Sequence, residues 1–193
     1  MTEQPPERDQ PVADTDDPVH VRTPPPARHA RAARIRPLQV LVAWLGAFAG
    51  IALVVLLVEL FPGMRLLLIG SFGASAVLLF AAPRAPFSQP RNLIGGHMIS
   101  AIVGVACFRY LPDLLFIQAS AAVATAIALM MLTRTVHPPG GATALIAVIG
   151  PEAVRGMGWA YVFPVLVGAL ALMLVALVSN NLLDAGSYPD RWD

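Results

Sequence analysis

The first long apolar segment, about residues 40–60, limits what this chain can fold into more than any other feature. An α-helix needs about 20 consecutive apolar residues to cross a bilayer, and Glu59, near the far end, is the only charged residue in this segment. Further apolar segments follow it. Charged residues make up 13% of the chain, against about 25% in a typical soluble domain. The sequence therefore predicts an all-α, polytopic membrane protein.

Residues 134–150 are the most irregular part of the apolar sequence. They contain an arginine, a histidine, two prolines and two glycines in close succession: Arg134, His137, Pro138, Pro139, Gly140 and Gly141. The apolar run that follows, residues 142–149, is too short to cross a bilayer as a helix. Irregular backbone is tolerated at membrane depth only where protein or a water-filled cavity surrounds it. We therefore expect a broken transmembrane element that carries the function.

An internal repeat relates this element to the apolar stretch at residues 66–82. A shift of 68 residues places Gly73 on Gly141 and Ser75 on Thr143, so a hydroxyl is kept at the same position. The matched stretch is short and consists of small residues, so a chance similarity is the alternative. The repeat predicts about six membrane-embedded helices in two halves, each a span, a broken element and a span.

Two topologies follow from this repeat. If the broken elements cross the membrane, the chain has six spans and the halves are inverted; if they re-enter, it has four. With six spans, Arg84, Arg91, Arg134 and Arg191 lie on the same side as the basic N-terminal segment. Because arginine-rich loops tend to remain in the cytoplasm, the arginines favour six spans and a cytoplasmic N-terminus. The expected location is a cell membrane, the inner membrane of a bacterium.

The chain divides into three parts. Residues 1–36 are rich in proline and charge and poor in apolar residues, so we expect a disordered cytoplasmic tail. Residues 37–183 form the transmembrane domain, and residues 184–193 form a short C-terminal tail. Trp159 and Tyr161 stand where the last span begins, which is typical of aromatic anchors at the membrane interface.

A helix that starts near Gly140 or Gly141 predicts an anion site, because the first turn has free N–H groups and a positive dipole end. The repeat places a related helix start near Ser71. The candidate binding residues are Ser71, Gly73, Ser75, His97, Arg134, His137, Pro138, Pro139, Gly140, Gly141 and Thr143. The alternatives are an arginine that reaches the membrane interface and histidines that serve only in packing or capping.

Metal and cofactor sites are not expected. Two histidines on separate spans have no carboxylate or cysteine at a ligand spacing beside them, and Cys107 is the only cysteine. The expected partners are membrane lipid and a small anion, with no nucleic acid. Whether the protein forms a homo-oligomer is left open by the sequence.

The sequence His137-Pro138-Pro139, followed by Gly-Gly-Ala-Thr-Ala, resembles the signature of the HPP family of integral membrane proteins. Residues 70–76 and 89–97 are similar to two other blocks of that family, and the resemblance extends over about residues 40–183. Family members are usually described as having four spans, which differs from the six favoured by the arginines. Some plastid and cyanobacterial relatives are linked to nitrite transport, so the resemblance implies an anion substrate.

The first hypothesis is therefore a membrane transporter or channel for a small inorganic anion, with nitrite as the best guess. One alternative is an intramembrane enzyme that uses His137 or His97 as acid or base. The lack of carboxylates near either histidine argues against an enzyme. Another alternative is a membrane scaffold subunit, for which uniformly apolar, unbroken spans would be expected.

Overall fold

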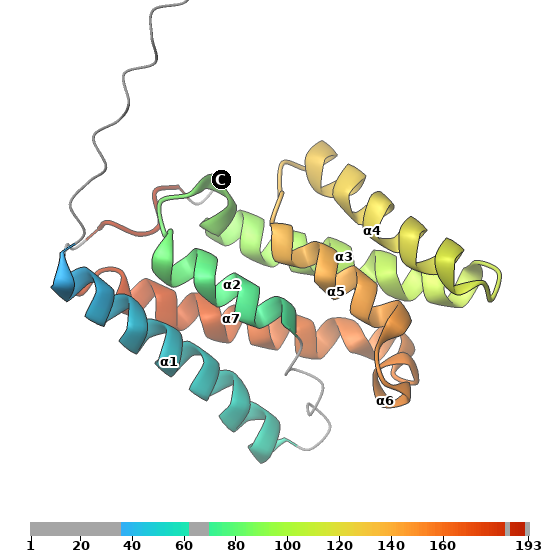
Figure 1. Cartoon of the computed structure of the whole chain (residues 1–193), viewed down its shortest axis with the longest axis horizontal. Helices are drawn as coiled ribbons and strands as arrows, with labels where there is room; N and C mark the ends of the chain where they lie inside the picture. The colour runs from blue at the N-terminus through green and yellow to red at the C-terminus, as the bar shows by residue number, and fades with distance from the viewer. Residues whose placement is uncertain (1–35, 62–69, 184–185, 192–193) are drawn as a thin grey trace, which may run out of the picture. The chain divides into compact units, whose positions relative to one another are not determined.

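A computed structural model describes residues 36–61, 70–183 and 186–191 (Figure 1). Apart from Arg36, the tail predicted for residues 1–36 lies outside this range. Within it, the bundle consists of apolar α-helices: α1 (Pro37–Leu60), α2 (Gly70–Ala81), α3 (Pro90–Tyr110), α4 (Leu115–Leu132), α5 (Pro138–Ile149) and α7 (Val162–Ser179). Shorter pieces are η2 (Pro86–Ser88), α6 (Glu152–Arg155) and η3 (Gly158–Tyr161). The described residues contain no strand, which confirms the all-α prediction.

The helices fall into two length classes. Four helical segments in the described part are long and apolar enough to cross a membrane: α1, α3, α4 and residues 158–179, which contain α7. The helices α2 and α5 are apolar but have 12 residues each, which is about 18 Å at 1.5 Å per residue. These two half-length helices are the broken elements that the sequence predicted.

Successive helices alternate in direction. At one end of the bundle the Asn180 amide, just after α7, donates to Leu79 O in the last turns of α2. Arg91, at the start of α3, donates there to Thr133 O just after α4. At the opposite end Gln118, at the start of α4, donates to Phe108 O near the end of α3. The six apolar helices therefore alternate in direction between the two ends (Figure 1).

The two halves of the bundle are inverted repeats. The helices α2 and α5 have bounds that differ by 68 residues at both ends, the shift found in the sequence. The contacts follow the same relation, because α1 packs on α2 and α7 whereas α4 packs on α5 and α3. Likewise α2 packs on α7 as α5 packs on α3. Each pair of corresponding helices runs in opposite directions, so the inverted repeat predicted from the sequence is confirmed.

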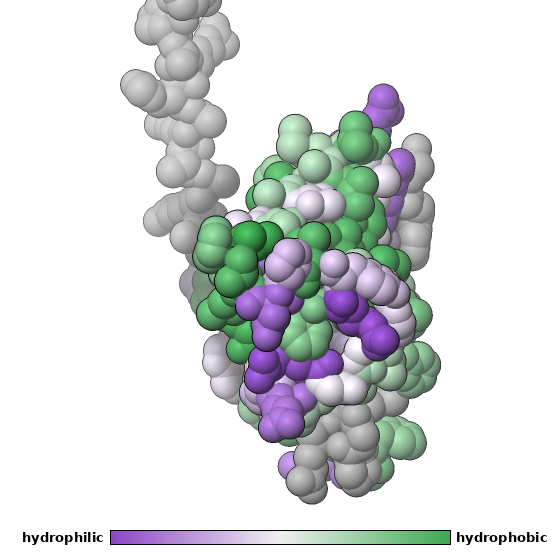
Figure 2. Space-filling model, turned by 90° about the vertical axis from the view of Figure 1, so that its right-hand side faces the viewer, coloured by the Kyte–Doolittle hydropathy of each residue, from purple (hydrophilic) through white to green (hydrophobic). Residues whose placement is uncertain are grey.

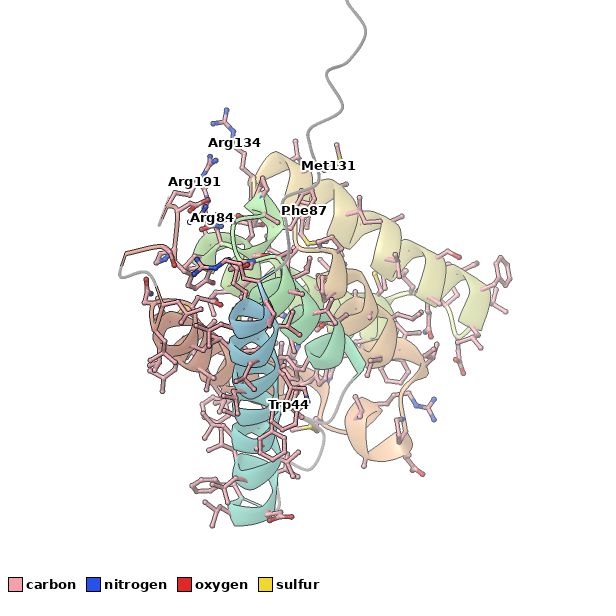
Figure 3. The ribbon with its side chains drawn as sticks, turned by 60° about the vertical axis from the view of Figure 1, so that its left-hand side comes forward. Trp44, Arg84, Phe87, Met131, Arg134 and Arg191 are labelled. Atoms are coloured by element: carbon pink, nitrogen blue, oxygen red, sulfur yellow. The ribbon has the colours of Figure 1, made fainter. Side chains whose placement is uncertain are left out.

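The helices α1 and α4 lie on the outside of the bundle. Each buries one narrow stripe at four-residue intervals: Gly46, Gly50, Val54 and Val58 on α1, and Gln118, Ala122, Ala126 and Met130 on α4. A Cβ atom on Gly46 would lie 2.7 Å from Phe80 of α2, so glycine permits this approach. Their remaining faces are apolar and exposed, as Trp44 in Figure 3 illustrates. Such faces suit contact with lipid.

Charged residues gather at the two ends. Arg36, Arg84, Arg91, Arg134 and Arg191 belong to one end, which we call the arginine-rich end; three of them are labelled in Figure 3. Among the described residues the opposite end has Arg109 and Arg155. Figure 2 looks onto the molecule from the right-hand side of Figure 1 and shows hydrophilic residues gathered in the centre of that face with apolar residues around them.

Several local predictions need correction. Helix α5 begins at Pro138 rather than near Gly140 or Gly141, because proline at the first helical positions lacks only an N–H that the helix leaves unpaired. The prediction of an interfacial anchor was wrong for Tyr161, which is 1% exposed. Its hydroxyl finds a partner inside the bundle, as described below.

Candidate functional site

Five polar side chains meet in the middle of the bundle, and we call them the central cluster. They are Ser71 and Ser75 from α2, His97 from α3, His137 immediately before α5, and Thr143 from α5. Each of the five is 0% exposed. Polar side chains buried inside a membrane protein are costly and usually functional. The cluster is therefore the strongest candidate site in the described residues.

Two glycines let α5 begin directly against α3. A Cβ atom on Gly96 would lie 2.5 Å from the Cβ atom of His137, and one on Gly140 would lie 2.7 Å from Ser100 Oγ and 3.0 Å from Gly96 O. Contacts below 3.0 Å do not occur for real Cβ atoms, so these positions require glycine at this spacing. The close approach brings the two imidazole rings to 4.9 Å between centroids.

The Ser75 hydroxyl joins the two histidines. Its Oγ atom lies 2.9 Å from His97 Nε2 and 2.8 Å from His137 Nε2. The same hydroxyl also lies within donating distance of Ser71 O, at 3.0 Å. One serine therefore faces two imidazole nitrogens from different halves of the repeat.

The network continues on both sides of this serine. Beyond His97, its Nδ1 atom lies 2.8 Å from Thr143 Oγ1, and the Thr143 and Ser71 hydroxyls lie 3.0 Å apart. The backbone carbonyl of Thr143 accepts a hydrogen bond of 3.1 Å from Tyr161. On the other side, His137 Nδ1 lies 2.8 Å from the carbonyl oxygen of Phe87. Phe72 covers the His97 ring at 5.1 Å between centroids.

The Phe87 carbonyl fixes the tautomer of His137. A carbonyl oxygen only accepts hydrogen bonds, so Nδ1 of His137 carries a proton. In the neutral ring Nε2 is then an acceptor, and Ser75 is the donor that faces it. Ser75 in turn accepts from His97 Nε2, which leaves His97 Nδ1 to accept from the Thr143 hydroxyl. In this state the chain of donation runs from Thr143 through His97, Ser75 and His137 to Phe87 O, and the Ser75 and Thr143 protons are turned away from Ser71 O and Ser71 Oγ.

The loop that carries Phe87 is held by the C-terminal residues 186–191, which we call the C-terminal strap. The Tyr188 hydroxyl donates to Ser88 O at 2.8 Å, and burial raises the pKa of that hydroxyl so that it stays a donor. Gln89 is 1% exposed, and its Oε1 accepts from the backbone N–H groups of Asp190 and Arg191. The strap thus fixes the carbonyl that orients His137.

Other predicted site residues lie apart from the cluster. Arg134 is exposed at the arginine-rich end (Figure 3), where its φ of 57° forms the left-handed residue after α4. Gly73 and Pro138 are also exposed, and Gly141 is partly buried. The N–H of Gly140 already donates to His137 O at 2.8 Å, and Pro138 and Pro139 have no N–H. The start of α5 therefore has few free backbone donors.

Some residues of the site were not found from the sequence. Phe87 acts through its backbone carbonyl and Tyr161 through a hydroxyl that reaches another helix, and neither leaves a local signal. By contrast, the Gly95-Gly96 pair immediately before His97 is a local signal in the sequence, because small residues allow two membrane helices to approach closely. No group of three or more potential metal ligands occurs among the described residues.

Comparisons with known proteins agree with this architecture. Residues 32–189 match the family described as HPP, transmembrane region. Two transmembrane proteins of Dictyostelium discoideum are similar to the chain, at 44% identity over 155 residues (77% of this chain, 54% of the relative) and 42% over 156 residues (78% and 50%). The chain spans about half the length of these relatives, and no solved structure matches it. With the family region covering the whole bundle, this chain belongs to the HPP family of transmembrane proteins.

Proposed function

We propose that this protein carries a small inorganic anion across a cell membrane, with nitrite as the first candidate, and that the anion binds at the central cluster. The observation that carries the proposal is the meeting of two oppositely directed half-length helices, α2 and α5, at five buried polar side chains. Interrupted helices at corresponding positions of two repeats are the common pointer to a transporter site.

The chemistry of the cluster supports an anion rather than a cation. Three hydroxyls and two imidazoles supply O–H and N–H donors, which replace the hydration of an anion. Among the described residues, no carboxylate hydrogen-bonds to the cluster. Nitrite is suggested by the resemblance to family members that are linked to its transport.

An enzyme is the second candidate, because Ser75, His137 and the Phe87 carbonyl stand in the order of nucleophile, base and orienting group. Two features favour transport. Ser75 is fully buried, and its oxygen is shared by two histidines instead of facing a cleft. We therefore propose that the protein is not an enzyme.

The test is anion uptake by the purified protein in liposomes, with nitrite, nitrate and chloride compared. We expect Thr143→Val to lower the initial rate of nitrite uptake by roughly 10- to 100-fold, because a hydrogen bond to a charged group contributes about 1.5–3 kcal/mol and about 1.4 kcal/mol is tenfold. Thr143→Ser keeps the hydroxyl and should retain most of the rate.

Arg134→Gln is the matched control outside the cluster. The exposed position of Arg134 leads us to expect uptake within about twofold of the unmodified protein. Liposomes without protein give the background from nitrous acid, which crosses lipid unaided. Equal rates for Thr143→Val and the unmodified protein would place the anion elsewhere.

For the orientation, we propose that the arginine-rich end faces the cytoplasm. In a Cys107→Ala background, a cysteine at exposed Ala82 should be protected from an impermeant thiol reagent added outside cells. A cysteine at exposed Asp113, at the opposite end, should react. The reverse labelling pattern would contradict a cytoplasmic arginine-rich end and would support four spans or an inverted orientation, and labelling of both from outside would show that α3 does not cross the membrane.

A further inference from the structure

The Ser75 hydroxyl has one proton and two acceptors in reach. His137 Nε2 lies 2.8 Å from Oγ, and Ser71 O lies 3.0 Å from it. Rotation about the Cβ–Oγ bond moves the proton from one acceptor to the other, and no heavy atom has to move. The two positions correspond to two different protonation states of the neighbouring histidines.

When Ser75 donates to His137 Nε2, both histidines are neutral. When Ser75 donates to Ser71 O, its lone pairs face both Nε2 atoms, and each nitrogen must then carry a proton to remain bonded. His97 already donates through Nε2 in the first state. His137 must gain a proton at Nε2. Its Nδ1 atom keeps its own proton, which is hydrogen-bonded to Phe87 O, so the ring becomes an imidazolium.

In the part of the chain that the structure describes, no charged side chain hydrogen-bonds to the cluster to compensate this imidazolium. From α2 the neighbours are Ser71, Ser75 and Phe72; from α3, His97; from α5, Thr143. The other titratable group that reaches the cluster is Tyr161 of η3, which donates to the Thr143 carbonyl. Arg91, Arg109, Arg134 and Arg155 belong to the two ends of the bundle. A buried charge without a partner is strongly unfavourable, so a bound anion would stabilise the protonated state.

We propose that His137 binds one proton together with each anion, with the Ser75 hydroxyl as the switch between the loaded and unloaded cluster. The proton enters at His137 Nε2 from water on the side of uptake and leaves from the same atom on the other side. This inference rests on the proposed function and adds the coupling ion to it. One proton with one monovalent anion makes transport electroneutral.

Transport in liposomes tests the stoichiometry. Nitrite uptake and internal pH are followed together in liposomes containing the full-length protein, and rates from protein-free liposomes are subtracted. We expect one proton taken up per nitrite and an initial rate that rises by up to about tenfold per unit fall in external pH. A potassium diffusion potential should leave the rate unchanged.

The outcomes separate the two proposals. Protein-dependent nitrite uptake that follows the membrane potential and moves no proton would overturn the coupling and leave the proposed function standing. Uptake of none of the three anions above the protein-free rate would overturn both. Proton uptake equal to nitrite uptake would support both.

The protonation state of His137 can also be measured directly by NMR, so the inference can be tested without a transport assay. In protein labelled with ¹⁵N-histidine, the His137 signals, identified by their loss in His137→Gln, should change from the Nδ1–H neutral ring to imidazolium when sodium nitrite is added at constant pH. We expect Ser75→Ala to abolish that change. Ser100→Ala should preserve it, because Ser100 is a buried serine on α3 whose hydroxyl donates to the Met130 sulfur at 3.9 Å and not to a histidine. A neutral His137 in the presence of nitrite that is bound would contradict the inference, whatever the variants do.

Discussion

Replacing Gly104 by alanine is expected to lower the free energy of unfolding by about 1–3 kcal/mol, the range typical of overpacked cores. Gly104 lies on α3 where α5 packs closely against it, and the new Cβ atom would lie 2.5 Å from the backbone oxygen of Ala144. A side chain can relieve a clash by changing its rotamer, but a backbone oxygen in a helix cannot. The clash therefore forces α3 and α5 to separate. Thr143, next to Ala144, would lose its distance of 2.8 Å to His97.

The measurement is unfolding of the purified protein in mixed micelles, followed by circular dichroism. Gly73→Ala is the matched control, because a Cβ atom there would meet nothing within 4 Å on the exposed side of α2. Alanine is a better helix former than glycine by about 0.8–1.0 kcal/mol, so this control should be neutral or stabilising. Similar stabilities for Gly104→Ala and Gly73→Ala would mean that α3 and α5 do not pack as described.

Gln89→Leu is the second substitution with a large expected effect, a loss of about 3 kcal/mol of stability. The Gln89 amide nitrogen donates to Pro83 O and Ala85 O, and its oxygen accepts from two N–H groups of the C-terminal strap. Leucine has a similar size and makes none of these bonds. The partners left behind are backbone groups around a side chain that is 1% exposed, where an unpaired polar group is costly.

Gln118→Leu provides the comparison, since it makes the same chemical change at another buried position. Gln118 is 4% exposed and donates to Phe108 O and Leu111 O at 3.2 and 3.3 Å. We expect a loss of about 1 kcal/mol there. Limited proteolysis should also cut the C-terminal strap faster in Gln89→Leu than in Gln118→Leu, and equal cutting would show that Gln89 does not hold the strap.

The architecture was predictable because it depends on pattern. The lengths of the apolar segments and the internal repeat at a shift of 68 residues can both be read directly from the sequence. Together they identified α2 and α5 as related half-length helices. Helix starts were less predictable. The pair Pro138-Pro139 looked like an interruption, whereas proline suits the first turn of a helix, so α5 begins there.

The polar side chains of the candidate site were predictable from the sequence, but the hydrogen bonds between them were not. Ser71, Ser75 and Thr143 followed from the repeat, and His97 and His137 from their glycine and proline neighbours. That both histidines meet a single serine depends on helix packing across 62 residues of sequence, which no local pattern encodes. The placement of Arg134 depends on how α4 ends, since its N–H bonds to Met131 O in a left-handed cap.

The C-terminal strap gives the site a dependence on the order of synthesis. Every helix of the bundle precedes residues 186–191 in the chain, so the strap is the last of the described segments to be synthesised. Before Tyr188 and the backbone of residues 190–191 bind the Ser88–Gln89 turn, that turn is held by its side-chain bonds to residues 78–85. We therefore expect the histidine–serine network to reach its final geometry only after the strap has been synthesised and has docked.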